Sequence, residues 1–200
     1  MEEIRPRYEF RIWGDQLGAV RKRLERLAEP KISASEETYL ISAATDNCNA
    51  KIRASLMDIK VLVAVNQGLE QWKPIMKGEF PLPSSVIAEQ VFPSLQVATP
   101  ALPKPAYELH EFLDEVIRPH PSLNIAEVCK NRYQFRVGDC SAEYAQITIN
   151  GHARDTAAVE SVDPEAVLQL VRDLCITDAN TSYIREIKRV LGLVAETIRA

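Results

Sequence analysis

Alternation of apolar and polar residues predicts β-strands along much of the chain. Five such stretches lie in the first half, at 7–13, 37–43, 49–55, 58–65 and 69–78, and three in the second half, at 127–138, 141–151 and 154–161. They are rich in β-branched and aromatic residues, and turn signals at Ser55 to Met57 and at 66–68 separate some of them. Pro74 interrupts the fifth stretch, which predicts a sheet edge or a bulge there because proline cannot donate a ladder hydrogen bond.

Apolar residues at helical spacing predict helices between and after these strands. Asp15 is a candidate N-cap for a helix that ends before Pro30, and a short helix is expected to start near Ser84. The apolar stripe of the first helix consists of Leu17, Val20, Leu24 and Leu27. A further helix is predicted from a second apolar stripe, which consists of Tyr107, Leu109, Phe112, Leu113, Val116 and Ile117. The proline-rich stretch 98–105 is expected to be extended.

Two helices are predicted to close the chain. The first begins at Asp163-Pro164-Glu165, which places a cap, a proline at the first helical position and an acid in the first turn. The second begins near Ser182. The residues expected to face inward are Val167, Leu170, Val171 and Leu174 in the first, and Ile184, Ile187, Val190, Leu191, Val194 and Ile198 in the second.

Seven or eight consecutive strands with helices around them indicate an α+β protein built on a closed antiparallel sheet. A barrel of about eight strands leaves an interior that side chains or one small ligand can fill. Lys51, Arg53 and Lys60 point to one face of this sheet, so that face is either exposed to solvent or lines a cavity for an anion. The 200 residues fit one domain spanning 1–200, with an inserted helical segment around 96–122.

The amino-acid composition of the chain excludes several classes of function. The net charge of −4 argues against general nucleic-acid binding, which usually needs a basic domain, but it allows a local basic cavity. The four cysteines form no C-x-x-C pair, and the three histidines show no ligand spacing, so neither a disulfide nor a zinc site is expected. The start of the chain contains no apolar signal core, and no apolar run is long enough to span a bilayer. We therefore expect a cytoplasmic protein with reduced thiols.

The order of the segments resembles the CYTH superfamily, also called triphosphate tunnel metalloenzymes. "NAKIRAS" followed by "MDIKVLV" is similar to the paired strands of the family, and "NRYQFRVGDCSAEYAQITING" is similar to its second-half hairpin. "AVESVDPEAVLQLVRDL" and "TSYIREIKRVL" are similar to its closing segments. The resemblance implies an eight-stranded antiparallel tunnel barrel that binds triphosphate groups through arginines and lysines, and a divalent metal through glutamates.

The first strand departs from the family hallmark E-x-E-x-K. In "EFRIW", Glu9 fits the first glutamate, but Arg11 stands at the second and Trp13 at the lysine. A cation at that position repels a metal ion by a few kcal/mol at about 4 Å and moderate dielectric, whereas it adds a donor for phosphate. The metal ligands that remain by resemblance are Glu9, Glu143 and Glu160. The phosphate-binding candidates are Arg11, Lys51, Arg53, Lys60, Lys73, Arg132, Arg136 and Lys188.

These residues predict a basic tunnel that binds a triphosphate-type or other phosphorylated anion, such as a small molecule or polyphosphate. The sequence leaves open whether the protein is also an enzyme. If it is, weak or altered hydrolysis of a phosphoanhydride would depend on Mg²⁺ or Mn²⁺. The alternative is a catalytically inactive CYTH-like module that binds a partner protein or regulates one. The sequence names no catalytic residue and leaves the oligomeric state open, a homodimer included.

Overall fold

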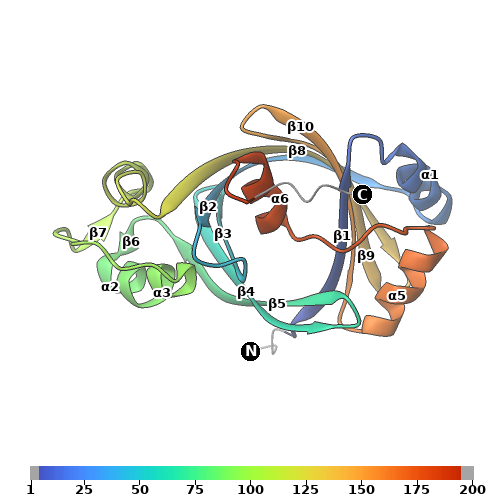
Figure 1. Ribbon diagram of the computed structural model, residues 1–200, viewed down its shortest axis with the longest axis horizontal. Coiled ribbons are helices and arrows are strands. Elements are labelled where there is room, and N and C mark those ends of the chain that lie inside the picture. The colour runs from blue at the N-terminus through green and yellow to red at the C-terminus, as the bar shows by residue number, and fades with distance from the viewer. Residues whose placement is uncertain (1–4, 195–200) are drawn as a thin grey trace.

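The computed structural model describes residues 5–194. Within these residues, eight antiparallel strands close into a barrel (Figure 1). The order around the barrel is β1-β10-β9-β8-β2-β3-β4-β5, and β5 pairs back to β1. The strands are β1 (Arg7–Gly14), β2 (Lys31–Ser42), β3 (Cys48–Arg53), β4 (Leu56–Asn66), β5 (Leu69–Glu79), β8 (Leu123–Val137), β9 (Cys140–Ile149) and β10 (His152–Ser161). This confirms the predicted α+β fold with an eight-stranded antiparallel barrel.

Local sequence signals account for one tight turn and one irregularity of the barrel, but not for the start of β2. Ala54 and Ser55 turn the chain between β3 and β4 with φ of 49° and 58°, one residue earlier than the predicted turn. Pro74 lies opposite Lys60, directly beside a register shift in the β4–β5 ladder, which confirms the predicted irregularity at this proline. β2 begins six residues before its predicted start because its first half, 31–36, pairs with β8 although few of its residues are apolar.

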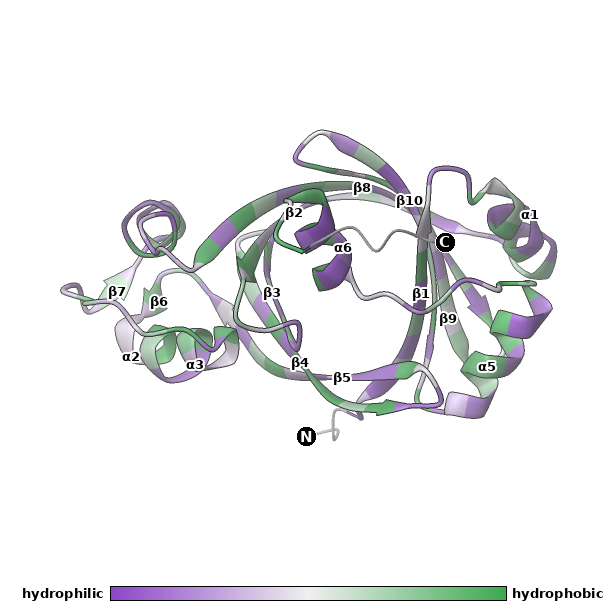
Figure 2. Ribbon diagram, in the orientation of Figure 1, coloured by the Kyte–Doolittle hydropathy of each residue, from purple (hydrophilic) through white to green (hydrophobic). Residues whose placement is uncertain are grey.

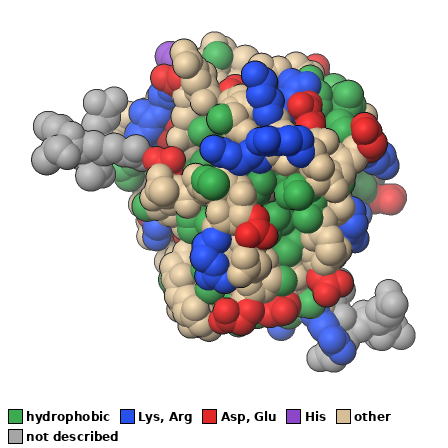
Figure 3. Space-filling view, turned by 90° about the vertical axis from the view of Figure 1, so that its right-hand side faces the viewer, with side chains coloured by type: hydrophobic (Ala, Val, Ile, Leu, Met, Phe, Trp, Pro, Cys, Tyr) green, Lys and Arg blue, Asp and Glu red, His purple; other side chains and the backbone are tan. Residues whose placement is uncertain are grey.

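Two helices cover the outside of the barrel. α1 (Gly18–Leu27) and α5 (Pro164–Asp173) pack apolar residues against β1, β9 and β10. The Asp163 side chain accepts a hydrogen bond from the amide of Glu165, as its cap position predicts. The predicted cap at Asp15 is wrong: α1 starts at Gly18, and the Asp15 carboxylate instead pairs with Arg154 at 2.5 Å. On this face basic, acidic and apolar side chains are intermixed (Figure 3).

A helical lobe lies beside the barrel, on the left of Figure 1. It comprises β6 (Leu82–Pro83), α2 (Ser84–Val86), the π-helical turn η1 (Ile87–Val91), α3 (Phe92–Leu95), β7 (Ala106–Tyr107), α4 (Leu109–Glu111) and the π-helical turn η2 (Phe112–Ile117). The helix predicted near Ser84 is confirmed, and the segment 98–105 has no helix or strand. Buried residues of the lobe pack against outward-facing side chains of β3 and β4, so the lobe covers the barrel without entering it.

The last described helix, α6 (Tyr183–Val190), lies within the ring of strands (Figure 1). It begins next to Ser182, as predicted, and the Ser182 side chain caps it by accepting a hydrogen bond from the amide of Arg185. Tyr183, Ile184 and Ile187 pack with inward-facing residues of β2, β8 and β9, and Figure 2 shows apolar and polar residues alternating along β8. α6 thus closes one end of the barrel with apolar side chains.

The end of α6 differs from the prediction. The helix stops at Val190, and Val194, which was expected to face inward, is 41% exposed. Ile198 lies outside the described residues.

Ile187→Ala tests whether α6 is an integral part of the core. We expect it to lower the free energy of unfolding by about 2–5 kcal/mol, because Ile187 is fully buried and truncation leaves a cavity. For a chain of this size that lowers the melting temperature by roughly 5–15 °C. Val194→Ala is the control, since an exposed site changes stability by about 0.5 kcal/mol or less. Equal melting temperatures for the two variants would show that α6 is not held in the barrel.

Candidate functional site

The barrel encloses a cavity of about 780 Å³. Alternate residues of the strands point into it, and Ser182 and Tyr183 lie at the end closed by α6. Among its described lining residues, ten are basic and six are acidic, so the lining has a formal charge of four positive although the whole chain is negative. The basic ones are Arg5, Arg7, Arg11, Lys31, Lys51, Arg53, Lys60, Lys130, Arg132 and Arg136, and the acidic ones Glu9, Glu29, Glu37, Asp58, Glu143 and Glu160. This volume accommodates a small molecule of ordinary ligand size.

Six of the eight predicted phosphate-binding residues line this cavity: Arg11, Lys51, Arg53, Lys60, Arg132 and Arg136. Two do not. Lys73 is exposed, because its neighbours Trp72 and Pro74 are the β5 residues that line the cavity. Lys188 is buried on α6, where its Nζ donates to the Thr45 carbonyl at 2.9 Å and pairs with Asp46 at 2.6 Å. The assignment of these two lysines to the cavity is therefore corrected.

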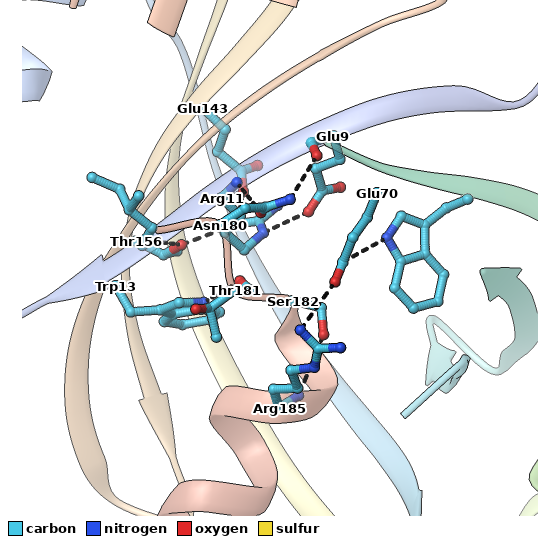
Figure 4. Close-up of polar contacts among 12 residues, drawn as sticks. Glu9, Arg11, Trp13, Glu70, Glu143, Thr156, Asn180, Thr181, Ser182 and Arg185 are labelled. Atoms are coloured by element: carbon cyan, nitrogen blue, oxygen red, sulfur yellow. Dashed lines mark hydrogen bonds and ion pairs between the residues drawn. The ribbon is translucent and has the colours of Figure 1, made fainter. Parts of the chain in front are cut away.

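Arg11 is fixed on all sides (Figure 4). Its Nε donates to Glu9 Oε1 at 2.8 Å, its Nη1 donates to Thr156 Oγ1 at 3.1 Å, and its guanidinium lies 4.4 Å from the centre of the Tyr183 ring. Nη1 is also 3.8 Å from Glu143 Oε1. Burial opposes the charged form of Arg11, but the two carboxylates outweigh burial and raise its pKa. Burial likewise opposes the charge of Glu9, yet Arg11 lowers the pKa of that carboxyl below its ordinary value.

The three glutamates that resemblance assigns to a metal each pair with an arginine. Glu9 pairs with Arg11, Glu160 with Arg7 at 3.0 Å, and Glu143 with Arg132 at 2.5 Å. Mg²⁺ and Mn²⁺ prefer an octahedral set of oxygen ligands, but the Arg11 guanidinium lies between Glu9 and Glu143. Within residues 5–194 there is also no group of three or more His, Cys, Asp or Glu side chains that could hold a metal ion. In this arrangement the three carboxylates do not fit a divalent cation.

A second cluster in the cavity lining joins the predicted Lys51 and Arg53 to two residues that were not predicted, Glu37 and Lys130. Glu37 on β2 is buried, and its Oε2 lies 2.7 Å from Lys130 Nζ, 3.1 Å from Lys51 Nζ and 3.0 Å from the Tyr39 hydroxyl. Arg53 Nη1 is 3.5 Å from the other oxygen. Burial alone would raise the pKa of Glu37, but Lys130 and Lys51 lower it strongly, so the carboxylate is charged at neutral pH.

Lys130 is the most perturbed lysine of this cluster. Its Nζ donates to the Tyr39 hydroxyl at 3.0 Å and lies 4.1 Å from the centre of the Tyr183 ring. Burial and the nearby charge of Lys51 lower its pKa to about 7, against the opposing effect of Glu37. Strand alternation could have found both missed residues, because Glu37 is two residues from Tyr39 and Lys130 is two residues from Arg132.

The segment before α6 fixes the closed end of the cavity to β1 (Figure 4). The amide of Thr181 donates to the Arg11 carbonyl, and the Trp13 indole donates to the Thr181 carbonyl, both at 2.8 Å. Trp13 also meets Tyr183 edge to face, with ring centres 4.7 Å apart. Arg185 on α6 adds an ion pair with the buried Glu70 at 3.6 Å. These contacts hold Tyr183 in place under the cavity.

Comparison with known proteins gives a structural likeness only. No protein-family model matches the chain, and no curated protein matches it. The PH1012 protein of Pyrococcus horikoshii OT3 superimposes with a TM-score of 0.53 at 14% identity, over 90% of this chain and 96% of that one. HpAC1 of Hippeastrum, described as a candidate adenylyl cyclase with a dominant triphosphatase activity, gives 0.52 at 11% identity, over 97% and 100% of the two chains.

A third solved structure superimposes on this chain about as well as these two. The candidate adenylate cyclase bh2851 of Bacillus halodurans gives a TM-score of 0.50 at 10% identity, over 93% of this chain and 98% of that one. The likeness covers nearly the whole of each chain, so it concerns the complete barrel and not one motif. At such low identity it establishes the fold alone. The chain therefore has the CYTH-like tunnel-barrel fold that its sequence resembles.

Proposed function

We propose that the barrel cavity binds a phosphorylated polyanion of the triphosphate type. The observation that carries the proposal is the formal charge of four positive on the cavity lining, inside a protein whose net charge is −4. A triphosphate bears about four negative charges, and its oxygens accept charge-assisted hydrogen bonds from arginine and lysine. Low-dielectric walls around a cavity strengthen such attraction relative to an exposed basic surface.

The basic residues of the cavity lining differ in whether they already form an ion pair with an acidic side chain. Lys60 on β4 and Arg136 on β8 line the cavity, yet neither forms an ion pair or side-chain hydrogen bond with another described residue. They are therefore the first candidates to contact phosphate. Arg132 pairs with Glu143, and Lys51 and Arg53 pair with Glu37, so these three would bind a ligand while sharing their charge with a carboxylate.

The proposal concerns binding, and hydrolysis is a second candidate. The dominant triphosphatase activity described for HpAC1 supports a triphosphate as the class of ligand. Hydrolysis of a phosphoanhydride usually needs Mg²⁺ or Mn²⁺ to neutralise developing charge. Since the carboxylates here do not fit such an ion, we propose that anion binding in this cavity does not require a metal. The inactive-module alternative predicts a partner protein and no preference among anions.

Isothermal titration with tripolyphosphate, pyrophosphate and orthophosphate in the presence of EDTA tests this proposal. We expect affinity to rise with ligand charge and to fall as salt is increased, because the attraction is electrostatic. A parallel assay of phosphate release with Mg²⁺ or Mn²⁺ decides between binding alone and hydrolysis. Failure of the folded protein to bind tripolyphosphate at low salt would refute the proposed function.

No helix in the described part of the chain combines the length and the apolar character needed to cross a membrane.

A further inference from the structure

One carboxylate in the cavity lining pairs with three cationic side chains, and we call Lys51, Arg53, Lys130 and Glu37 the central cluster. Glu37 on β2 lies between β3, which carries Lys51 and Arg53, and β8, which carries Lys130. The distances from its oxygens to the three cationic groups are 3.1, 3.5 and 2.7 Å. Glu37 is 2% exposed, and no described residue donates a hydrogen bond to its Oε1. Glu37 therefore takes the position in which a bound anion would meet these cations.

This arrangement creates a conflict for any anion that enters. A phosphoryl group that approaches Lys51 or Lys130 also approaches the Glu37 carboxylate, which is charged at neutral pH and repels it. The two lysine side chains are only 14% and 5% exposed, so little of either is open to a ligand, and both ammonium groups lie within 3.1 Å of Glu37. Arg53 is different, because 43% of its side chain is exposed.

A longer polyanion can overcome this repulsion by making contacts elsewhere. Lys60 on β4 and Arg136 near the end of β8 also line the cavity, and neither forms an ion pair with another described residue. A ligand with several phosphoryl groups can place most of its charge at these two residues, away from Glu37, whereas orthophosphate or sulfate that binds Lys51 and Lys130 must place all of its charge against Glu37. The energy gained away from Glu37 then offsets the repulsion close to it.

We propose that Glu37 is a specificity-determining residue that sets the minimum charge of the ligand. Its carboxylate neutralises Lys51, Arg53 and Lys130 when the cavity is free, and it keeps anions that bear one or two charges away from these cations. Only a ligand that reaches Lys60 and Arg136 as well binds tightly. This inference rests on the proposed function, since it presumes that the cavity takes a phosphorylated polyanion.

Glu37→Gln tests the inference, because glutamine keeps the size and one acceptor oxygen but removes the charge. Wild type and variant are titrated with orthophosphate and with tripolyphosphate in EDTA, and the ratio of the two dissociation constants is compared. We expect the variant to bind orthophosphate at least about tenfold more tightly and tripolyphosphate only a few times more tightly, so selectivity falls. An unchanged ratio would overturn the inference while leaving the proposed function intact.

Glu160→Gln is the matched control. Glu160 also lines the cavity and pairs with an arginine, but 33% of its side chain is exposed and its partner is Arg7, outside the central cluster. Its loss changes the net charge by the same amount, so we expect both ligands to gain equally and the ratio to stay constant. Equal loss of selectivity in both variants would show that overall charge, and not Glu37, sets the preference.

Two further outcomes are informative. If Glu37→Gln fails to fold, Glu37→Asp keeps the charge but withdraws the carboxylate by one methylene group, and we expect about threefold tighter orthophosphate binding. No change in that variant would overturn the inference. If neither wild type nor variant binds tripolyphosphate, the proposed function and the inference both fail.

Discussion

The double substitution of Lys60 and Arg136 by methionine is expected to weaken tripolyphosphate binding by at least about a hundredfold. Both residues line the cavity from different strands, and neither forms an ion pair with another described residue. A ligand that binds them does not have to break an existing ion pair. Hydrogen bonds to charged groups contribute about 1.5–3 kcal/mol each, and about 1.4 kcal/mol corresponds to a tenfold change in affinity. Isothermal titration in EDTA measures the effect directly.

A control variant that loses the same number of positive charges distinguishes binding in the cavity from binding at the protein surface. Lys73→Met combined with Lys22→Met also removes two positive charges, but Lys73 is exposed on β5 and Lys22 is exposed on α1, and neither lines the cavity. We expect this variant to bind within about threefold of wild type at moderate salt, because exposed distant charges are screened. If both double variants lose affinity to the same degree, the anion binds outside the barrel.

Part of this site could be predicted from strand alternation alone. Lys51 and Arg53 are two residues apart on one strand, and Arg132 and Arg136 are four apart on another, so each pair shares a face whatever the pairing of the strands. Closure of the sheet then turns these faces inward. Glu37 obeys the same rule relative to Tyr39, but an acidic residue in a tunnel expected to be basic was not recognised as part of the site.

The misplaced residues show where alternation stops being informative. Lys73 pairs with Val61, and Lys60 pairs with Pro74, so the register of the β4–β5 pair places the Lys73 side chain outside the barrel. A register that contains a bulge cannot be counted from sequence. Lys188 lies on a helix, and its direction depends on how α6 enters the barrel. No local pattern specifies that placement.

The contact between Arg11 and Glu143 illustrates a second limit. These residues are far apart in sequence and come together only because β10 lies between β1 and β9 in the barrel. The sequence predicted that Arg11 would oppose metal binding. It did not predict that Arg11 would be held by both carboxylates and by Thr156, which makes it a counterion within the wall more than a free donor to the ligand. Only the closed sheet reveals that role.

Replacing Arg11 with glutamate is expected to destabilise the free protein and to make its stability respond to Mn²⁺. The substitution leaves Glu9 and Glu143 without their shared cation and adds a third carboxylate, and breaking a buried ion pair costs about 3–5 kcal/mol. A divalent ion can then bind among three carboxylates, which supply the oxygen ligands it prefers. At a concentration about a hundred times its dissociation constant it restores about 2.7 kcal/mol, or roughly 5–10 °C in melting temperature.

Thermal denaturation with EDTA or with Mn²⁺ measures this response without any assay of activity. Wild type is expected to melt at the same temperature in both, because the Arg11 guanidinium already lies between the two carboxylates. Arg11→Gln removes the cation without adding a ligand charge, so its response to Mn²⁺ should be smaller than that of Arg11→Glu. If wild type is instead stabilised by Mn²⁺ by several degrees and Arg11→Gln is not stabilised more, Arg11 does not take the place of a metal. The cavity would then bind its anion together with a divalent ion held by other residues.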